Sequence, residues 1–196
     1  MDIELLYKFG ENLSDINGEF RRGIVHRLDR NTSGLLMIAK NNKTHEYLYE
    51  MIKNHNLTKK YRAILVGNYP LDEEIIEAPI GRHKTQPHKM TIDTDGKPST
   101  TILKVIERFK VATYVELNLI TGRTQQIRVH TSYKKHPVFN DTLYGAGQGK
   151  IKTDEQVLQS YYLKFAKPFS SEIIELGIEP DEKLSKVLNY FKNRRV

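Results

Sequence analysis

The feature that most restricts the fold of this chain is the run 112–121, in which two sets of side chains alternate. The two sets are Tyr114, Glu116, Asn118 and Ile120, and Val115, Leu117 and Leu119. A period of two residues places them on opposite faces of a β-strand. One largely polar face and one apolar face are typical of an antiparallel sheet that is covered on one side.

Other segments continue this pattern. Strands are predicted at 35–39, 58–67, 74–78, 101–107, 157–165 and 173–178. Helical spacing predicts helices over 2–9, 43–54 (capped by Asn41 or Asn42), 124–134 (capped by Thr124) and 182–192. Residues 81–98 are polar and basic, which indicates an exposed loop or hairpin. The expected fold class is α+β, with a mostly antiparallel mixed sheet and flanking helices.

Composition limits the function. The 196 residues are enough for one domain, 1–196, and their net charge of +7 favours a polyanionic partner, with RNA or DNA first and an anionic membrane second. The chain has no cysteine, which excludes disulfides and thiolate metal sites. No apolar run is long enough to span a bilayer and no secretory signal pattern is present, so a cytoplasmic protein is expected.

The densest cluster of reactive side chains is His26-Arg27-Leu28-Asp29-Arg30-Asn31-Thr32-Ser33-Gly34. Its only carboxylate, Asp29, lies between Arg27 and Arg30, and nearby cations stabilise an ionised acid. Thr32, Ser33 and Gly34 are typical turn residues. A rigid turn that presents a carboxylate beside a cation suits nucleophilic or acid–base chemistry, although a solvated surface loop is an equal alternative from these residues alone.

Two other segments carry candidate residues. Tyr61 shares a predicted strand face with Ala63 and Leu65, and by itself it is typical of a half-buried strand tyrosine. The segment 121–130 begins with a turn at Gly122 and continues as a helix, from whose second turn Arg128 would project. An ordinary surface arginine is the alternative there. The basic loop 81–98 is either solvated or in contact with an RNA backbone.

These segments resemble the motifs of the RluA-like family of pseudouridine synthases. The Asp29 segment matches His-Arg-Leu-Asp-x-x-Thr-Ser-Gly at all seven fixed positions, and Lys59–Ala63 matches Lys-x-Tyr-x-Ala. Residues 121–130 resemble Thr-Gly-Arg-Thr-His-Gln-Ile-Arg-Val-His, with Gln125 in place of histidine. Residues 137–145 resemble Pro-x-x-Gly-Asp-x-x-Tyr-Gly, with Asn140 in place of glycine, which asparagine can replace because it tolerates a positive φ.

The resemblance implies roles for individual residues. Asp29 would be the catalytic aspartate, held by a buried bidentate pair with Arg128, while Tyr61 lies against the target base and Arg27 takes the place of the flipped base. Substrate-binding positions would include His26, Arg30, Thr32, Arg123, Gln126 and Ile127. Asp29 would act at the ribose, either by attacking C1′ or by removing a proton.

The resemblance also implies the pseudouridine synthase fold, with a catalytic cleft across the sheet that the basic loops 82–97 and 147–152 would border. The expected activity is isomerisation of uridine in RNA, with ribosomal RNA before transfer RNA, by a monomer that needs no cofactor and no metal. The family's usual first strand and its accessory RNA-binding domain have no counterpart here, so an N-terminally truncated catalytic domain is expected.

A non-catalytic RNA-binding or ribosome-associated relative is the alternative. Gln125, Asn140 and the missing strand favour it. The joint presence of Asp29, Tyr61 and Arg128 favours the enzyme, because a protein that only binds RNA has no need of all three. A DNA-binding domain lacks support, since the sequence has no helix-turn-helix or zinc-finger spacing.

Overall fold

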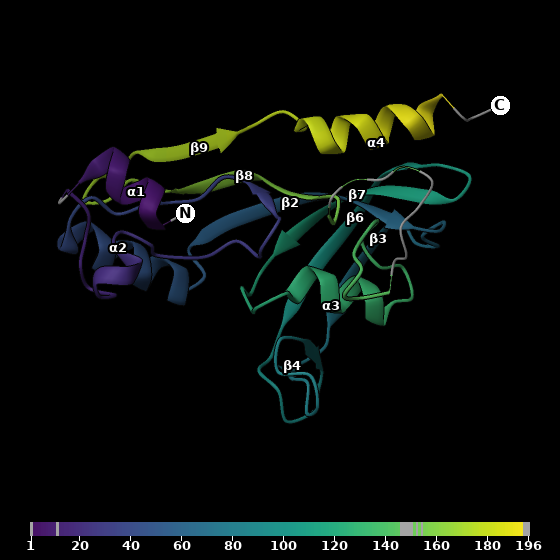
Figure 1. Cartoon of the computed structure of the whole chain (residues 1–196), viewed down its shortest axis with the longest axis horizontal. Coiled ribbons are helices and arrows are strands. Elements are labelled where there is room, and N and C mark those ends of the chain that lie inside the picture. Colours follow the sequence, from purple (N-terminus) through teal and green to yellow (C-terminus); the bar gives the residue numbers. More distant parts are fainter. Residues whose placement is uncertain (1, 11, 146–150, 152, 154, 194–196) are drawn as a thin grey trace.

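A twisted mixed sheet forms the centre of the computed structural model, which describes residues 2–10, 12–145, 151, 153 and 155–193 (Figure 1). Within these residues the strand order is β1-β8-β2-β7-β6-β3, and β9 pairs with β8. All the pairs are antiparallel except the pair of β1 with β8. This arrangement confirms the predicted α+β class with a mostly antiparallel mixed sheet.

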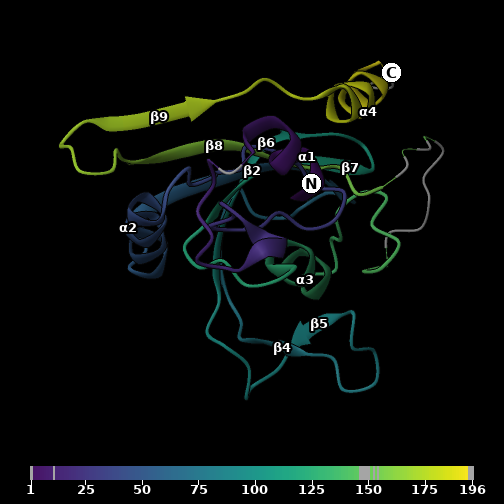
Figure 2. The ribbon, with the colours of Figure 1, turned by 60° about the vertical axis from the view of Figure 1, so that its left-hand side comes forward.

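The strands of this sheet are β1 (Ser33–Gly34), β2 (Leu57–Val66), β3 (Glu73–Glu77), β6 (Thr100–Arg108), β7 (Ala112–Leu119), β8 (Leu158–Ala166) and β9 (Ile173–Gly177). The helices are α1 (Asp2–Phe9), α2 (Asn42–Lys53), α3 (Gln126–Tyr133) and α4 (Glu182–Lys192), with a 3₁₀ turn η1 (Glu19–Arg21). Strands β4 (Ile80–Arg82) and β5 (Met90–Ile92) form a separate hairpin that projects beyond α3 (Figure 2). The hairpin predicted within 81–98 is therefore confirmed.

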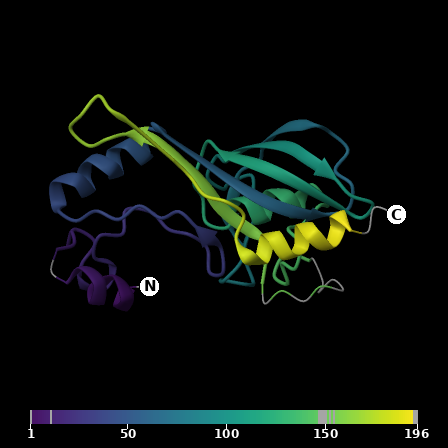
Figure 3. The same cartoon turned by 90° about the horizontal axis from the view of Figure 1, so that it is seen from above.

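Two apolar layers hold the sheet between helices. On one face Tyr61, Ala63 and Leu65 of β2 pack with Ile127 of α3, and Leu28 joins this layer at its edge. On the other face Ile64 of β2 packs with α4, which lies across the sheet in Figure 3. The period-2 pattern of β2 thus supplies both layers, and Leu28 fixes the Asp29 loop to the first one.

Helix ends follow local chemistry. The Asn41 side chain caps α2 by accepting a hydrogen bond from the Thr44 N–H at 2.8 Å. The Asp181 side chain caps α4 in the same way through the Leu184 N–H at 2.7 Å. No helix in the described residues is long and apolar enough to cross a membrane.

The strand predicted over 35–39 is wrong. The nearest strand, β1, ends at Gly34, and within 35–39 only Ile38 makes an isolated bridge, to Ile24. The backbone N–H groups here find acceptors outside a neighbouring strand. The Met37 N–H donates to the His26 ring at 2.9 Å, and the Ala39 N–H donates to the Gly23 carbonyl at 2.8 Å. Apolar residues are therefore buried here without a sheet neighbour. Gly34 is required in β1, because a Cβ there would lie 2.0 Å from the Ser160 carbonyl oxygen.

Two further expectations need correction. Thr124 does not cap α3; the cap position is Gln125, in the left-handed region with φ 56°, and its side chain makes no cap hydrogen bond. The first half of strand β7 is covered on both faces, since α4 buries Tyr114 with Ile64 on the side predicted to be polar, whereas Glu116 and Asn118 stay partly exposed as predicted. The tolerant turn predicted at Asn140 is confirmed by its φ of 61°.

Candidate active site

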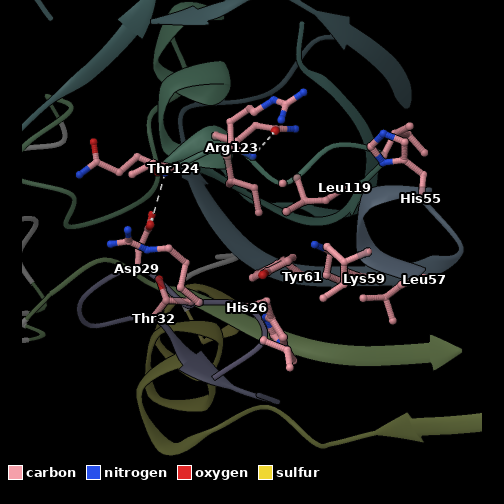
Figure 4. Close-up of a pocket in the computed structure, with 18 of the residues that line it drawn as sticks. His26, Asp29, Thr32, His55, Leu57, Lys59, Tyr61, Leu119, Arg123 and Thr124 are labelled. Atoms are coloured by element: carbon pink, nitrogen blue, oxygen red, sulfur yellow. Dashed lines mark hydrogen bonds between the residues drawn. The ribbon is translucent and has the colours of Figure 1, made fainter. Parts of the chain in front are cut away.

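A cavity of about 430 Å³ opens beside the sheet, where the Asp29 loop, α2, β2, the end of β7 and the start of α3 meet (Figure 4). Its lining includes Asp29, Tyr61 and most of the substrate-binding positions expected from the sequence, namely His26, Arg27, Thr32, Arg123, Gln126 and Ile127. Three segments far apart in the chain therefore converge on one cavity.

Hydrogen bonds with residues distant in the sequence hold the turn that carries Asp29. Gln156 Nε2 donates to the Arg30 carbonyl at 2.8 Å, and Lys183 Nζ donates to the Asn31 carbonyl at 3.0 Å. The Ser33 hydroxyl donates to the Asp181 carboxylate at the start of α4. Arg30 itself is exposed and is not among the residues that line the cavity. These contacts hold the turn rigid and aim Asp29 inward.

Two donors face the Asp29 carboxylate. The Gln125 N–H, at the first turn of α3, donates to Oδ1 at 3.3 Å, and Arg128 Nη1 lies 3.8 Å from Oδ2. Burial raises the pKa of Asp29 above its ordinary value, and Arg128, the Gln125 N–H and Arg27 offset this only in part. The neighbouring cations therefore favour the ionised form of Asp29, as expected, but desolvation has the larger effect on its pKa.

The bidentate partner of Arg128 is Asp141, not Asp29 as expected. Arg128 Nε donates to Asp141 Oδ2 at 2.6 Å and Nη2 donates to Oδ1 at 2.9 Å, with the Asp141 side chain fully buried. One edge of the guanidinium is thus occupied, and Nη1 is the atom that faces Asp29. Asp141 was missed as a site residue, although it is the aspartate of the fourth motif.

Tyr61 lies on the cavity wall between Asp29 and Lys59 (Figure 4). It is 7% exposed. Burial raises the pKa of Tyr61 to about 12, with a hydrogen bond to Ser160 acting in the opposite direction. The side chain is therefore a neutral phenol at physiological pH, with its ring against the space that Asp29 faces.

His26 and Gln126 line the cavity but already have partners. His26 Nε2 accepts a hydrogen bond from the Met37 N–H at 2.9 Å, and burial, helped by Lys59, lowers the pKa of His26 to about 4. Gln126 Oε1 accepts from the Thr121 hydroxyl at 2.8 Å and from the Arg123 N–H at 2.9 Å. Both side chains fix the loops around the cavity, and their roles in substrate binding stay predictions.

The side chain of Gln125 connects the β4–β5 hairpin to the site. Its Oε1 accepts from the Met90 N–H at 3.1 Å and from the Tyr144 hydroxyl at 2.5 Å, and its Nε2 donates to the His88 carbonyl at 3.2 Å. Gln125, which stands where the family's third motif has histidine, therefore uses both its side-chain oxygen and its side-chain nitrogen in hydrogen bonds. The expected border loop 147–152 lies almost entirely outside the described residues.

Sequence reasoning missed one end of the cavity. Tyr49, Ile52, Lys53 and His55, from the last turns of α2 and the residues after it, line that end together with Lys59. Lys59 could have been found, because it lies two residues before Tyr61 and so shares its strand face. The contribution of α2 had no comparable signal. Among the described residues, no group of three or more potential metal ligands occurs.

Comparison with known proteins gives a consistent result. A family model described as RNA pseudouridylate synthase matches residues 3–133. The chain is 43% identical over 183 residues to a Bacillus subtilis protein called an uncharacterized RNA pseudouridine synthase, YlyB, covering 93% of this chain and 60% of that one. It is 39% identical to the ribosomal large subunit pseudouridine synthase D of Vibrio parahaemolyticus, covering 84% of this chain and 54% of the relative.

A solved structure matches as well. Human RNA pseudouridylate synthase domain containing 1 superposes with a TM-score of 0.74 at 28% identity, covering 96% of this chain and 83% of that one. This likeness supports the fold expected from the motifs. The chain spans little more than half of the length of the curated relatives named above.

Proposed function

Because this chain belongs to the RNA pseudouridylate synthase family, we propose that it isomerises specific uridines in RNA to pseudouridine. The proposed RNA is that of the large ribosomal subunit, since one relative is named a ribosomal large subunit pseudouridine synthase. The basic balance of the chain, with a net charge of +7, agrees with an RNA substrate.

One observation carries this proposal. Asp29, Tyr61 and Arg128 come from separate segments, yet Asp29 and Tyr61 line the same cavity and Arg128 lies within 3.8 Å of Asp29. A buried carboxylate beside a cation and an apolar-faced aromatic ring is a site for attack or proton transfer on a bound base and sugar. A fold that only bound RNA would not need a carboxylate aimed into a cavity.

The proposed reaction uses the side chains of this chain as follows. The target uridine leaves its stack and enters the cavity, as enzymes that modify bases require, and the exposed Arg27 fills the gap. Asp29 acts at the ribose, by attack on C1′ or by removal of a ribose proton, and the bond between N1 and C1′ breaks. The released uracil turns against Tyr61 and C5 bonds to C1′, which displaces the Asp29 carboxylate from C1′ in the first case and returns a proton to the ribose in the second. The C5 proton is then lost and N1 gains a proton.

The α3 end of the site suits this chemistry. The Gln125 N–H is among the donors at a helix N-terminus that no residue of the same helix accepts, and such donors stabilise an anion. Arg128 adds a cation whose position is fixed by Asp141. Asp29 thus keeps a defined orientation while its raised pKa keeps it a stronger base than a solvated carboxylate.

The test is direct. The purified 196-residue chain is incubated with unmodified ribosomal RNA and transfer RNA made in vitro, and pseudouridine is mapped at single-nucleotide resolution. We expect modified positions in large-subunit ribosomal RNA. Modification only in transfer RNA contradicts the substrate, and RNA binding without any modified position supports the non-catalytic alternative.

We further propose that residues 1–196 act as one catalytic domain, as a monomer, in the cytoplasm. Sedimentation of the chain alone and with RNA tests the monomer. A concentration-dependent mass that correlates with activity contradicts it.

A further inference from the structure

Besides the Asp29 carboxylate, the cavity is lined by the cations Arg27, Lys53, Lys59 and Arg123. Lys59, on β2, lines the cavity and lies on the far side of Tyr61 from Asp29 (Figure 4). Two residues along a strand separate side chains on one face by about 7 Å, so Lys59 is the next residue to Tyr61 on the cavity face of β2. A base seated against Tyr61 would have Asp29 on one side and the Lys59 ammonium on the other.

In the described part of the chain, Lys59 has no counter-charge. Among the described residues no carboxylate oxygen lies within 4.0 Å of its Nζ, and it makes no hydrogen bond there. Burial lowers the pKa of Lys59, with no carboxylate acting in the opposite direction. The adjacent Lys60 points to the opposite face of β2 and pairs with Glu116 at 3.0 Å.

The space around the ammonium is kept open. Gly122 follows β7, and a Cβ placed on it would lie 3.0 Å from Lys59 Nζ. The glycine therefore lets the ammonium approach the backbone at the rim of the cavity. Leu57 and Leu119 line the same part of the cavity and supply no polar partner from their side chains.

We propose that Lys59 binds a phosphodiester of the RNA next to the target nucleotide and so positions the flipped uridine over Tyr61. The inference rests on the proposed function, because it assumes that the cavity receives RNA. A partly desolvated cation requires an anion, and the only anions along RNA are its phosphates. A uracil carbonyl is neutral and would leave the ammonium uncompensated.

The experiment is a binding scan with neutral phosphates. The probe is the shortest RNA that retains a modified uridine in the mapping experiment, or a uridine-loop RNA of similar length if none is modified. Methylphosphonates replace the phosphates one at a time on both sides of the target uridine. We expect one position to weaken binding by the wild-type chain about tenfold, and to have no effect on Lys59→Met, which itself binds the unmodified RNA about tenfold more weakly.

Salt dependence gives an independent readout. The slope of log K against log salt concentration should become shallower by about 0.7 in Lys59→Met, as for the loss of one single-strand phosphate contact. Lys110→Met is the matched control, since Lys110 is exposed in the β6–β7 turn at the opposite end of β7 from Leu119. Gly122→Ala, which crowds Lys59 without removing its charge, should reduce the same methylphosphonate effect.

Each outcome is decisive. If Lys59→Met and wild type show the same effect at every methylphosphonate position, the inference is wrong, even if the chain makes pseudouridine. A change in turnover alone, with both the scan and the slope unaltered, places the ammonium at the base and also overturns it. If one methylphosphonate weakens binding by the wild-type chain but not by Lys59→Met, and no pseudouridine is formed, the phosphate contact is supported and the proposed function is contradicted.

Discussion

The two ends of the cavity differ in how they treat charge. At the α3 end, Asp29, Arg128 and Asp141 form a connected set in which the cation faces two carboxylates. At the α2 end, Lys59 is half-buried and has no carboxylate beside it in the described part of the chain. At the α3 end the charged side chains are already paired with one another in the free protein. At the α2 end the Lys59 ammonium lacks a negative partner, which a bound substrate can supply. We infer that chemistry belongs to the first end and substrate positioning to the second.

The largest effect is expected when the carboxylate of Asp29 is removed from the α3 end. Asp29→Asn should lower turnover by about 10²–10⁴-fold, the range for loss of a positioned acid–base group, while RNA affinity changes less than about threefold. Single-turnover formation of pseudouridine and RNA binding are measured on the same preparations. Glu73→Gln, on the exposed face of β3, is the control for loss of a carboxylate. Residual activity above about a tenth of wild type contradicts the role of Asp29.

Breaking the connected set should reduce stability. Asp141→Asn leaves Arg128 with a weaker partner in a buried position, so the free energy of unfolding should fall by about 3 kcal/mol, measured by urea denaturation. The matched control is Glu172→Gln, which breaks the surface pair with Lys167 (2.6 Å) and should change the unfolding free energy by less than about 1 kcal/mol. Equal effects of the two changes would mean that the Arg128–Asp141 pair is not a structural support.

The two ends should respond to pH in opposite directions. Asp29 has a raised pKa, so its ionised form lowers stability above that pKa and the penalty disappears as pH falls. Asp29→Asn should therefore raise the unfolding free energy at pH 7, with the gain shrinking toward acid pH. Lys59 has a lowered pKa, so Lys59→Met should also stabilise at pH 7, with the gain shrinking as pH rises.

Chemical denaturation across pH, with Lys110→Met as the control for charge, measures both gains. Gains that do not depend on pH would mean that packing, rather than buried charge, explains them.

The smallest effect is expected for the side chain of Gln125, at the α3 end. Gln125→Ala removes the side-chain bonds to Met90, Tyr144 and His88 but keeps the backbone N–H that faces Asp29. Stability should fall by about 1 kcal/mol, and hydrogen exchange at the Met90 amide should quicken. Gln125→His, which restores the family's usual residue, should recover part of this protection. An unchanged Met90 exchange rate would show that the hairpin does not depend on Gln125.

Much of the architecture was predictable from local patterns. The runs at 58–67 and 101–107 became β2 and β6, and helical spacing placed α2 and α4 within about one residue of their ends. The strand at 35–39 failed because burial of apolar residues does not say which groups accept their backbone N–H donors. Those acceptors are the His26 ring and the Gly23 carbonyl, which only the folded loop brings near.

The sequence by itself determined the family, the candidate residues Asp29, Tyr61 and Arg128, and the face of β2 from which Tyr61 projects. The family and the candidate residues follow from the resemblance to the family's motifs, and the face of β2 follows from the two-residue period of a strand. Neither needs knowledge of distant segments. Only the tertiary structure decided that Asp141 is the bidentate partner of Arg128, that burial governs the pKa of Asp29, and that Lys59 has no carboxylate partner among the described residues. Desolvation and charge pairing depend on which segments meet in space, and spacing along the chain does not specify that.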